Sequence, residues 1–297
     1  MNITRPASRS ATLERESSAP PPELLFHYTT PAGLLGIARS RELWASNVMC
    51  LNDHKEVEHA ADYAKWAIGN LVQGSGYSGP ERNLLEKMSE SAATAARRYY
   101  IASFSAERDM LSQWRGYSPS GGGYSLGISS AHLRSIAHVQ SFFLAPCIYE
   151  HRIKYQIASE IAHSYVEDYR SPTSETDESK VKRIAWEFGQ HLARYGSMLK
   201  HHAFHEEREW RLISPMIGEP HPRLEFRPTS SRIVPYYRFA LVDADHPNLI
   251  TTGTDNLTII LGPTSNDMLE SLSIQFMIHS LIGAAAIGKS EIPFRTL

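Results

Sequence analysis

The chain has 297 residues, a formal net charge of −2 and 42% hydrophobic residues. A chain of this length forms one large domain or two modest ones, and either buries a sizeable core without disulfide bonds or a structural metal. The nearly balanced charge excludes a general attraction to nucleic acid or to membranes, so partners have to be inferred from individual sites.

Residues 1–22 predict a flexible leader. They are rich in Ser, Arg, Pro and Glu and end in three consecutive prolines. Such a composition cannot bury enough apolar surface to stay ordered alone. The segment lacks the hydrophobic stretch of a secretory signal. A Ser-rich leader is still compatible with a targeting signal for a specialised export system.

From residue 23 onward, short strand-like runs alternate with helical patterns. The first strand is Leu24–Thr29, and Thr30 followed by Pro31 predicts the start of a helix. Further strands are expected at 41–46, 99–105, 123–129, 144–153, 210–214, 224–228, 233–242 and 257–262. Further helices are expected at about 53–69, 81–98, 109–117, 154–200 and 266–281, with a polar interruption at 171–179.

No internal repeat and no linker is visible after residue 23. Residues 23–297 therefore predict a single α+β domain with a mixed sheet flanked by helices, into which a long helical insertion is placed at about 154–200.

Cysteine and histidine spacing argues against a metal site. The two cysteines, Cys50 and Cys147, have neither zinc-binding spacing nor a disulfide framework, which is typical of a reducing compartment. None of the fourteen histidines falls in an HExxH motif. No run reaches the ~18 apolar residues that a membrane helix requires. We therefore expect a cytoplasmic protein without a metal and without a membrane partner.

Charged and large apolar residues alternate over 203–213, which predicts an extended strand. Residues two apart in a strand share a face. The expected faces are Glu207, Glu209 and Arg211 on one side and Arg208, Trp210 and Leu212 on the other. On a central strand the charged face would line a cleft, whereas on an edge strand it would only be solvated.

Polar residues two apart also occur on two other predicted strands. The three pairs are His27 with Thr29, Ser103 with Ser105, and Glu207 with Glu209. If the strands meet around one groove, these side chains suit a ribose and an amide, with a carboxylate that accepts a 2′-hydroxyl hydrogen bond and stabilises an oxocarbenium-like carbon. Any half-exposed strand shows the same period, so a solvated face remains the alternative.

Two further interpretations stay open. Same-face residues on one strand lie about 7 Å apart, so Glu207 and Glu209 are also compatible with the acid and base of a hydrolase or nuclease. The segment with Trp114, Arg115, Tyr117 and Tyr124 around three glycines suits either a ligand-binding lid or an ordinary connection.

Taken in order along the chain, the motifs resemble the prokaryotic domain-of-unknown-function family 2971 from Leu25 to Arg295. The matching pieces are Phe26-His27-Tyr28-Thr29, Leu43-Trp44-Ala45, Leu51-Asn52-Asp53 with Glu56, Ser103-Phe104-Ser105, Asp109, Trp114, Tyr117, Gly123, Phe204 to Arg211, Val234-Pro235-Tyr236, Ile260 to Pro263, Ser290 and Pro293-Phe294-Arg295. The family's name carries no activity with it.

The order His-x-Thr, Ser-x-Ser, Glu-x-Glu is also similar to ADP-ribosyltransferase-like domains. This resemblance implies a split sheet with NAD in its cleft. It implies Glu209 as the carboxylate at the nicotinamide ribose and Glu207 as the group that positions the acceptor. It implies a cofactor-binding set of His27, Thr29, Ser103, Ser105, Trp114, Arg115, Tyr117 and Tyr124.

The expectation is therefore a transferase that moves ADP-ribose from NAD to an unidentified macromolecule, in a toxin or an antiviral defence system. The alternatives are a non-enzymatic ligand-sensing or interaction module, and a hydrolase or nuclease that uses the Glu207/Glu209 cleft. Neither the acceptor nor the oligomeric state follows from the sequence.

Overall fold

Among the residues that the structure describes, ten strands form one mixed sheet. Their bounds are β1 (Leu24–Thr29), β2 (Glu42–Asn47), β3 (Tyr100–Ser105), β4 (Tyr124–Ser129), β5 (Phe143–Pro146), β6 (Glu209–Ile213), β7 (Leu224–Pro228), β8 (Ile233–Ala240), β9 (Leu257–Leu261) and β10 (Ala286–Lys289). The strand order is β10-β9-β4-β1-β3-β2-β8-β7, while β6 pairs with β3 and β5 beside this path. Strand β10 is parallel to β9 and the other pairs are antiparallel. The expected α+β class is thus confirmed.

This computed structural model describes residues 9–51, 55–73, 76–92, 95–117, 122–229, 231–242, 257–263 and 267–293. Its helices are α1 (Ala11–Ser17), α2 (Pro31–Ser40), α3 (Lys55–Gln73), α4 (Gly79–Ala92), α5 (Leu111–Tyr117), α6 (Ser130–Val139), α7 (His151–Arg170), α8 (Asp177–Gly196) and α9 (Asp267–Met277). Short helical turns are η1 (Val48–Cys50), η2 (Ala95–Arg98), η3 (His202–Glu207) and η5 (Ile278–Ile282). No described helix is both long and apolar enough to cross a membrane.

The sheet divides at β3. One edge of β3 pairs with β6 along Ile101 to Ser105. The other edge of β3 is shared by two strands. Strand β2 pairs with Tyr100 and Ile101 at the start of β3, and β1 pairs with Ser105 at its end. Strands β1 and β2 therefore diverge from β3 at opposite ends, and backbone groups in the middle of this edge lack strand partners. We call this place the sheet split.

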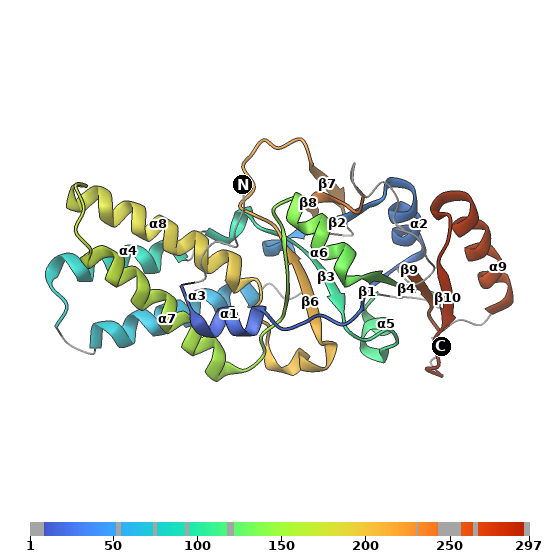
Figure 1. Ribbon diagram of the computed structural model, residues 1–297, viewed down its shortest axis with the longest axis horizontal. Helices are drawn as coiled ribbons and strands as arrows, with labels where there is room; N and C mark the ends of the chain where they lie inside the picture. The colour runs from blue at the N-terminus through green and yellow to red at the C-terminus, as the bar shows by residue number, and fades with distance from the viewer. Residues whose placement is uncertain are drawn as a thin grey trace.

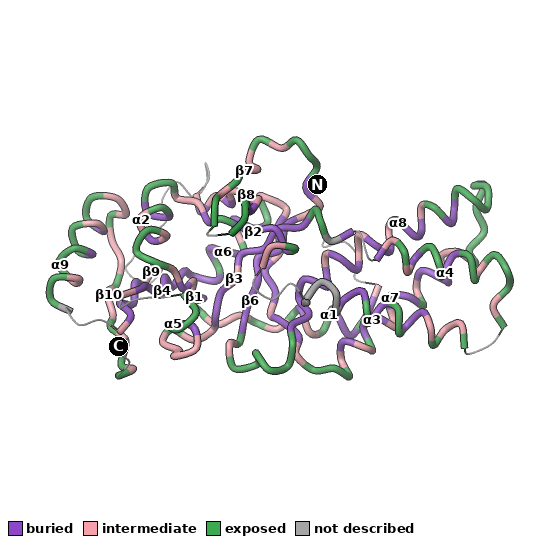
Figure 2. Tube along the Cα trace, turned by 180° about the vertical axis from the view of Figure 1, so that it is seen from behind, coloured by how far each residue is buried: buried purple, intermediate pink, exposed green. Residues whose placement is uncertain are grey.

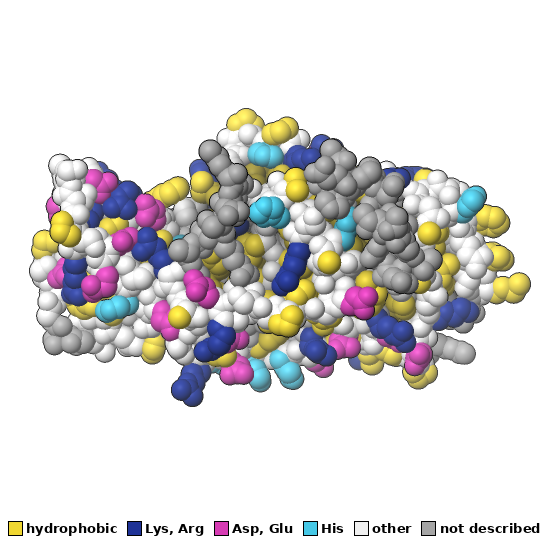
Figure 3. All heavy atoms as spheres, in the orientation of Figure 1, with side chains coloured by type: hydrophobic (Ala, Val, Ile, Leu, Met, Phe, Trp, Pro, Cys, Tyr) yellow, Lys and Arg dark blue, Asp and Glu magenta, His cyan; other side chains and the backbone are white. Residues whose placement is uncertain are grey.

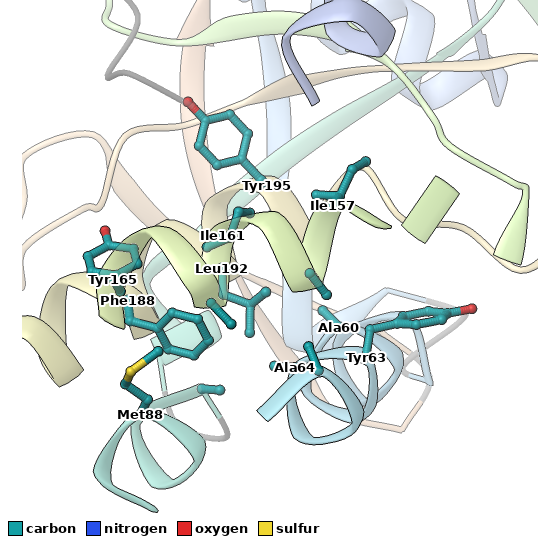
Figure 4. Close-up of a cluster of buried hydrophobic side chains, with 14 of the residues drawn as sticks. Ala60, Tyr63, Ala64, Met88, Ile157, Ile161, Tyr165, Phe188, Leu192 and Tyr195 are labelled. Carbon is teal, nitrogen blue, oxygen red and sulfur yellow. The ribbon is translucent and has the colours of Figure 1, made fainter. Parts of the chain in front are cut away.

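Two apolar cores lie on opposite faces of β3 and β6. Phe104 and Trp210 point into a core that is shared with α2, α6 and α9, whereas Ile101 and Ile213 point into a core formed by α3, α4, α7 and α8. Figure 1 shows these four helices as a lobe that projects from one end of the sheet, and Figure 2 shows that their inner sides are buried and their outer sides exposed. The close-up in Figure 4 shows the apolar side chains that join them.

The region expected to be helical at about 154–200 contains α7 and α8, which the loop at 171–176 connects. This loop is shorter than the interruption expected at 171–179, because Thr176 caps α8 by accepting a hydrogen bond from Ser179 N. Helices α3 and α4 pack into the same lobe. The lobe is thus assembled from two distant parts of the sequence, which a single insertion did not predict.

The described part of the expected leader is ordered. Helix α1 is capped by Ser10, and its Leu13 is fully buried against the lobe. The hydroxyls of Ser10 and Thr12 donate hydrogen bonds of 2.7 Å each to the Glu160 carboxylate on α7. The prediction of a flexible segment through residue 22 therefore differs from the structure over residues 9–22. Composition missed this helix because one buried leucine and a partner 150 residues away hold it.

Replacing Glu160 by Ala is expected to release α1, because Ser10 and Thr12 then lose their shared acceptor. Each lost hydrogen bond to a charged group is worth about 1.5–3 kcal/mol. Limited proteolysis should cut the variant within residues 9–22 at least several-fold faster than the unmodified protein. Replacing Glu178, whose partner among the described residues is the exposed Lys182 on α8, is the matched control. Equal cleavage rates in both variants would contradict this role of Glu160.

Candidate functional site

The register of β3 and β6 brings four polar side chains together. Ser103 lies opposite Arg211 and Ser105 lies opposite Glu209. Since residues two apart share a face, all four lie on the side that faces the helical lobe. The sequence predicted the shared faces of Ser103 with Ser105 and of Glu209 with Arg211, and the structure has both.

Glu207 is not on this strand. The segment before Glu209 forms the helical turn η3, and Arg208 then adopts a left-handed backbone conformation with φ of 42°. The Ser105 hydroxyl holds this turn by donating to the Glu207 carbonyl at 2.8 Å. The prediction of a continuous strand over 203–213 is therefore wrong for residues 203–208. Because the chain turns here, Glu207 and Glu209 are not same-face neighbours of one strand.

Lys200 brings the two carboxylates together instead. Its Nζ donates to Glu207 Oε2 at 2.6 Å and to Glu209 Oε2 at 2.5 Å. The Lys154 ammonium, itself buried, donates to the backbone carbonyl of Lys200 at 2.5 Å and fixes this position. Lys200 follows the end of α8 and carries no periodic signal, so the sequence did not predict it.

Arg211 completes a buried, charge-balanced cluster. Its Nε and Nη2 donate to the two oxygens of Glu209 at 2.7 and 3.1 Å, and its Nη1 donates to the Ser197 carbonyl at 2.7 Å. The two cations, Lys200 and Arg211, neutralise Glu207 and Glu209. We call these four residues the ion cluster.

The ion cluster keeps Glu209 ionised. Burial alone would raise the pKa of this carboxyl, but the charges of Arg211 and Lys200 outweigh burial and lower its pKa to about 2. Burial would likewise lower the pKa of Lys200, yet Glu209 raises it well above its usual value. A carboxyl group held in this way does not exchange protons near neutral pH. Glu209 therefore does not suit the general acid or base of a hydrolase.

His27 occupies the sheet split. Its Nδ1 lies 2.9 Å from the carbonyl oxygen of Ser103, one of the groups that lack a strand partner. Since a carbonyl only accepts, Nδ1 carries the proton in this contact. Burial lowers the pKa of His27 more than this hydrogen bond raises it, so the ring is neutral. Its Nε2 is then a hydrogen-bond acceptor.

A cavity of about 60 Å³ opens between these groups. Side chains from all three predicted polar strands line it, together with two that the sequence did not single out. The lining includes His27, Ser103, Ser105, Gln113, Tyr117, Lys200, Glu207 and Glu209. This volume suits a few water molecules or one small functional group. The convergence of His27, Ser103 and Glu209 is therefore present in the structure.

Several polar groups on this cavity have no partner among the described residues. Gln113 is 9% exposed, yet its amide makes no hydrogen bond there. The Ser103 hydroxyl and one oxygen of Glu207 are also without a partner in the described part of the chain. Tyr117 is 42% exposed at the cavity, and burial of its phenol and then the charge of Glu209 raise its pKa. Ser103 and Glu207 are partly exposed at the cavity, so these donors and acceptors are open to a polar ligand or to water.

Four residues of the expected cofactor-binding set do not line the cavity: Thr29, Trp114, Arg115 and Tyr124. Trp114 is fully buried, donates to Asp109 at 2.6 Å and packs on Tyr28 at 4.7 Å between ring centroids. Tyr124 is buried in the apolar core on the far face of the sheet. These two aromatic rings therefore support the fold and do not stack on a ligand.

Trp114 nevertheless fixes the cavity, because it lies on α5 between Gln113 and Tyr117. Gly262 follows β9 and lies against the Trp114 ring. A Cβ at position 262 would come within 3.0 Å of this ring and 2.9 Å of the Gly123 carbonyl. Only glycine allows so close an approach.

The described residues contain no group of three or more His, Cys, Asp or Glu side chains arranged to hold a metal ion. Asn52 and Asp53, quoted above as family motifs, lie outside the described residues, as does the side chain of Glu56. The hydrogen-bonding groups at the cavity are an amide, hydroxyls, carboxylates, an ammonium and an imidazole that accepts through Nε2, which suit an organic ligand with hydroxyl or amide groups.

The low pKa of Glu209 predicts a loss of stability in acid. A carboxyl whose pKa is lowered in the folded state stabilises the fold above its usual pKa of 4.5, and this contribution disappears as the pH falls to about 2. Urea unfolding between pH 5 and 2.5 should show the loss. The double variant Glu209→Leu/Arg211→Leu removes the titrating group and should give a flatter profile. Identical slopes would show that Glu209 does not carry this dependence.

Residues 113–212 match the sequence model of DUF2971, described as a protein of unknown function. Over this stretch, which is 100 of the 297 residues, the chain is similar to the DUF2971 family. The matched segment begins at Gln113 and contains the whole ion cluster, while His27 and Ser103 come from β strands that precede it. No curated protein and no solved structure matches the chain.

Proposed function

We propose that this protein binds NAD at the sheet split and transfers its ADP-ribose group to a macromolecule. The observation that carries the proposal is the single cavity on which His27, Ser103, Gln113 and Glu207 converge. Its unpartnered amide, hydroxyl and carboxylate oxygen complement the carboxamide and ribose hydroxyls of a nicotinamide riboside.

Each group has a role in the proposed complex. The Gln113 amide pairs with the nicotinamide carboxamide, and neutral His27 accepts a hydrogen bond from a ribose hydroxyl through Nε2. Lys200 holds the Glu207 carboxylate in place beside the ribose. At 60 Å³ the cavity receives the carboxamide end, and the remaining ligand extends past the exposed Tyr117.

The carboxylate that meets the ribose is Glu207 in this proposal. Both oxygens of Glu209 are engaged by Arg211 and Lys200, whereas Glu207 keeps one oxygen without a partner among the described residues. When the bond between ribose C1 and the pyridinium nitrogen breaks, the nitrogen takes the electron pair and nicotinamide leaves neutral. The acceptor's nucleophile then attacks C1, and Glu207 takes up its proton. Between the departure of nicotinamide and the attack of the nucleophile, the negative carboxylate stabilises the positive charge on the ribose.

Calorimetric titration with NAD and a nicotinamide-release assay test the proposal. We expect saturable binding, and we expect Gln113→Leu to weaken it roughly tenfold or more because an amide pair is lost. The exposed Gln275 on α9 is the matched control, and Gln275→Leu should bind like the unmodified protein. Absence of binding at millimolar NAD would overturn the proposal.

A ligand-sensing module without catalysis is the second candidate. It is favoured by the fixed, charge-balanced ion cluster, in which Glu209 stays ionised between two cations. Such a cluster organises a binding site without moving protons. Saturable NAD binding with no nicotinamide release, in the presence of a cell extract as a source of acceptors, would select this candidate.

A further inference from the structure

Strands β2, β8 and β7 lie side by side at one end of the sheet (Figure 1). Residues opposite each other in antiparallel strands share a face, so Trp44 lies on the same side as Arg238, and Ser46 on the same side as Tyr236. The alternate residues of β2 point into the core that is shared with α2, α6 and α9. We call the side that carries Trp44 the outer face. Its aromatic and basic side chains and its hydroxyl belong to Trp44, Ser46, Arg227, Arg232, Tyr236 and Arg238, and none of these residues lines the cavity at the sheet split.

Trp44 presents an open aromatic ring at the middle of this outer face. Its ring stacks on Tyr236, with 4.4 Å between the centroids and 28° between the planes. Trp44 is nevertheless 47% exposed, whereas Tyr236 beneath it is 7% exposed. The buried phenol ring therefore supports an indole that is open to solvent. A supported, exposed indole offers a stacking surface to a planar group such as a nucleic acid base.

Two arginines flank this ring. Arg227 on β7 lies 5.9 Å from the centroid of the Trp44 ring and donates through Nη2 to the Ser46 hydroxyl at 3.2 Å. Arg232, which precedes β8 and is exposed, donates through Nη2 to the Cys50 carbonyl at 3.0 Å. Neither arginine has a carboxylate partner in the described part of the chain. Since a guanidinium has five N–H donors, each arginine is fixed by one hydrogen bond and keeps donors for an anion.

Positive charge is concentrated on the β7–β8 hairpin. Residues 221–241 contain four arginines and one glutamate, so the hairpin carries a formal charge of +3 in a chain whose net charge is −2. Two carboxylates on the outer face, those of Glu42 and Glu225, each lie 3.9 Å from the Arg238 guanidinium, which makes no hydrogen bond with either. The carboxylates therefore offset the charge of Arg238 and leave the charges of the other arginines available to a polyanion.

We propose that the outer face binds single-stranded nucleic acid. A base stacks on Trp44, and the neighbouring phosphates accept hydrogen bonds from Arg227 and Arg232. Binding of single strands without sequence preference combines these two features, an aromatic surface for bases and positive side chains along the backbone. From Arg232 to Arg238 the hairpin extends roughly 20 Å, which gives room for several nucleotides. An acidic polypeptide would meet the same charges but has no base for the indole. This binding does not depend on the transfer reaction proposed above.

Fluorescence anisotropy with a labelled 12-nucleotide single strand, as DNA and as RNA, tests the proposal. Binding should be saturable and tighter than to the corresponding duplex, whose bases are stacked on each other. Trp44→Ala should raise the Kd roughly tenfold because base stacking is lost, whereas Trp44→Phe should retain most of the affinity. Trp66→Ala is the matched control, since Trp66 on α3 is 45% exposed and packs on Tyr155 away from this face.

Salt dependence tests the role of the arginines. Three phosphate contacts should give a slope of about −2 in a plot of log affinity against log salt concentration, and Arg232→Gln should reduce its magnitude by about 0.7. Arg134→Gln is the control, because Arg134 is exposed on α6 and also donates to a backbone carbonyl, at 3.4 Å. Circular dichroism identifies any variant that fails to fold, and Arg227→Gln then provides a second test of the same contact.

Three results would overturn the proposal. The first is the absence of saturable binding of the single strand at 50 mM salt. The second is an equal loss of affinity in Trp44→Ala and Trp66→Ala. The third is displacement of the strand by polyglutamate as readily as by unlabelled strand, which would indicate a surface for acidic polypeptides. Gln113→Leu should bind the strand like the unmodified protein, so a failure of NAD binding with retained, Trp44-dependent strand binding would leave this inference standing alone.

Discussion

Replacing Arg211 by Leu is expected to lower the free energy of unfolding by about 3–5 kcal/mol. Arg211 is 2% exposed and binds both oxygens of Glu209. Without it, a buried carboxylate keeps only Lys200 as a charged partner and Ser197 loses its donor. Urea denaturation followed by circular dichroism measures the change.

Arg208 provides the control within the same stretch. Its side chain is 65% exposed and pairs with Glu107 at the surface, so Arg208→Ala should change stability by no more than about 1 kcal/mol. The double variant Glu209→Leu/Arg211→Leu should recover part of the loss, because no unpaired carboxylate remains at position 209. If Arg211→Leu were as stable as Arg208→Ala, the ion cluster would not be a stabilising unit.

Glu207→Gln is expected to reduce nicotinamide release from NAD by about 100-fold or more while the protein stays folded. The amide retains the size of the side chain but loses the negative charge that stabilises an oxocarbenium-like ribose. Removal of one preorganised electrostatic group from a transition state, measured for a donor to an oxyanion, costs about 2.7–4 kcal/mol. Lys200 keeps Glu209 as its partner, so the free energy of unfolding should change little. Initial rates at saturating NAD measure the effect.

Glu206→Gln is the control for this experiment, because Glu206 is the neighbouring residue on the same helical turn and is exposed. It should release nicotinamide at the unmodified rate. Glu209→Gln should differ from Glu207→Gln and Glu206→Gln, because this variant should lose both nicotinamide release and folding stability. Normal turnover by Glu207→Gln would remove the catalytic role from this carboxylate and leave a binding site.

Local sequence signals predicted most of the strands, since polar and apolar residues alternate with the period of a strand. They also predicted the start of α2, where Thr30 accepts from Gly33 N and Pro31 occupies the first position. Strand β10 was missed, because a four-residue strand that pairs in parallel with β9 carries little pattern of its own.

The strands that line the cavity were predicted, whereas single residues on it were not. His27, Ser103 and Glu209 stand in period-two patterns, but the sequence left open whether their strands meet around one groove. Gln113 and Lys200 are isolated polar residues whose importance depends on contacts with distant strands. Glu207 was placed on a strand because the alternation at 203–213 continues through a helical turn, which only the left-handed Arg208 reveals.

Surface charge on the helical lobe gives no further guide to function. Figure 3 shows positive and negative side chains interspersed over the helical lobe, in agreement with the net charge of −2. Pairs such as Arg183 with Glu175 account for this mixture. Partners are therefore expected to recognise individual sites and not a field of one sign over the whole molecule.

The contact between Gly262 and Trp114 has a consequence for genetics. A side chain at position 262 pushes on the indole that fixes α5, and α5 carries Gln113 and Tyr117. A screen for inactive mutants should therefore recover substitutions of Gly262 as well as substitutions of cavity residues, although Gly262 itself does not line the cavity. Smaller replacements of Trp114 are not expected to suppress such mutants, because the Gly123 carbonyl would still obstruct the new side chain and the indole that fixes α5 would be lost.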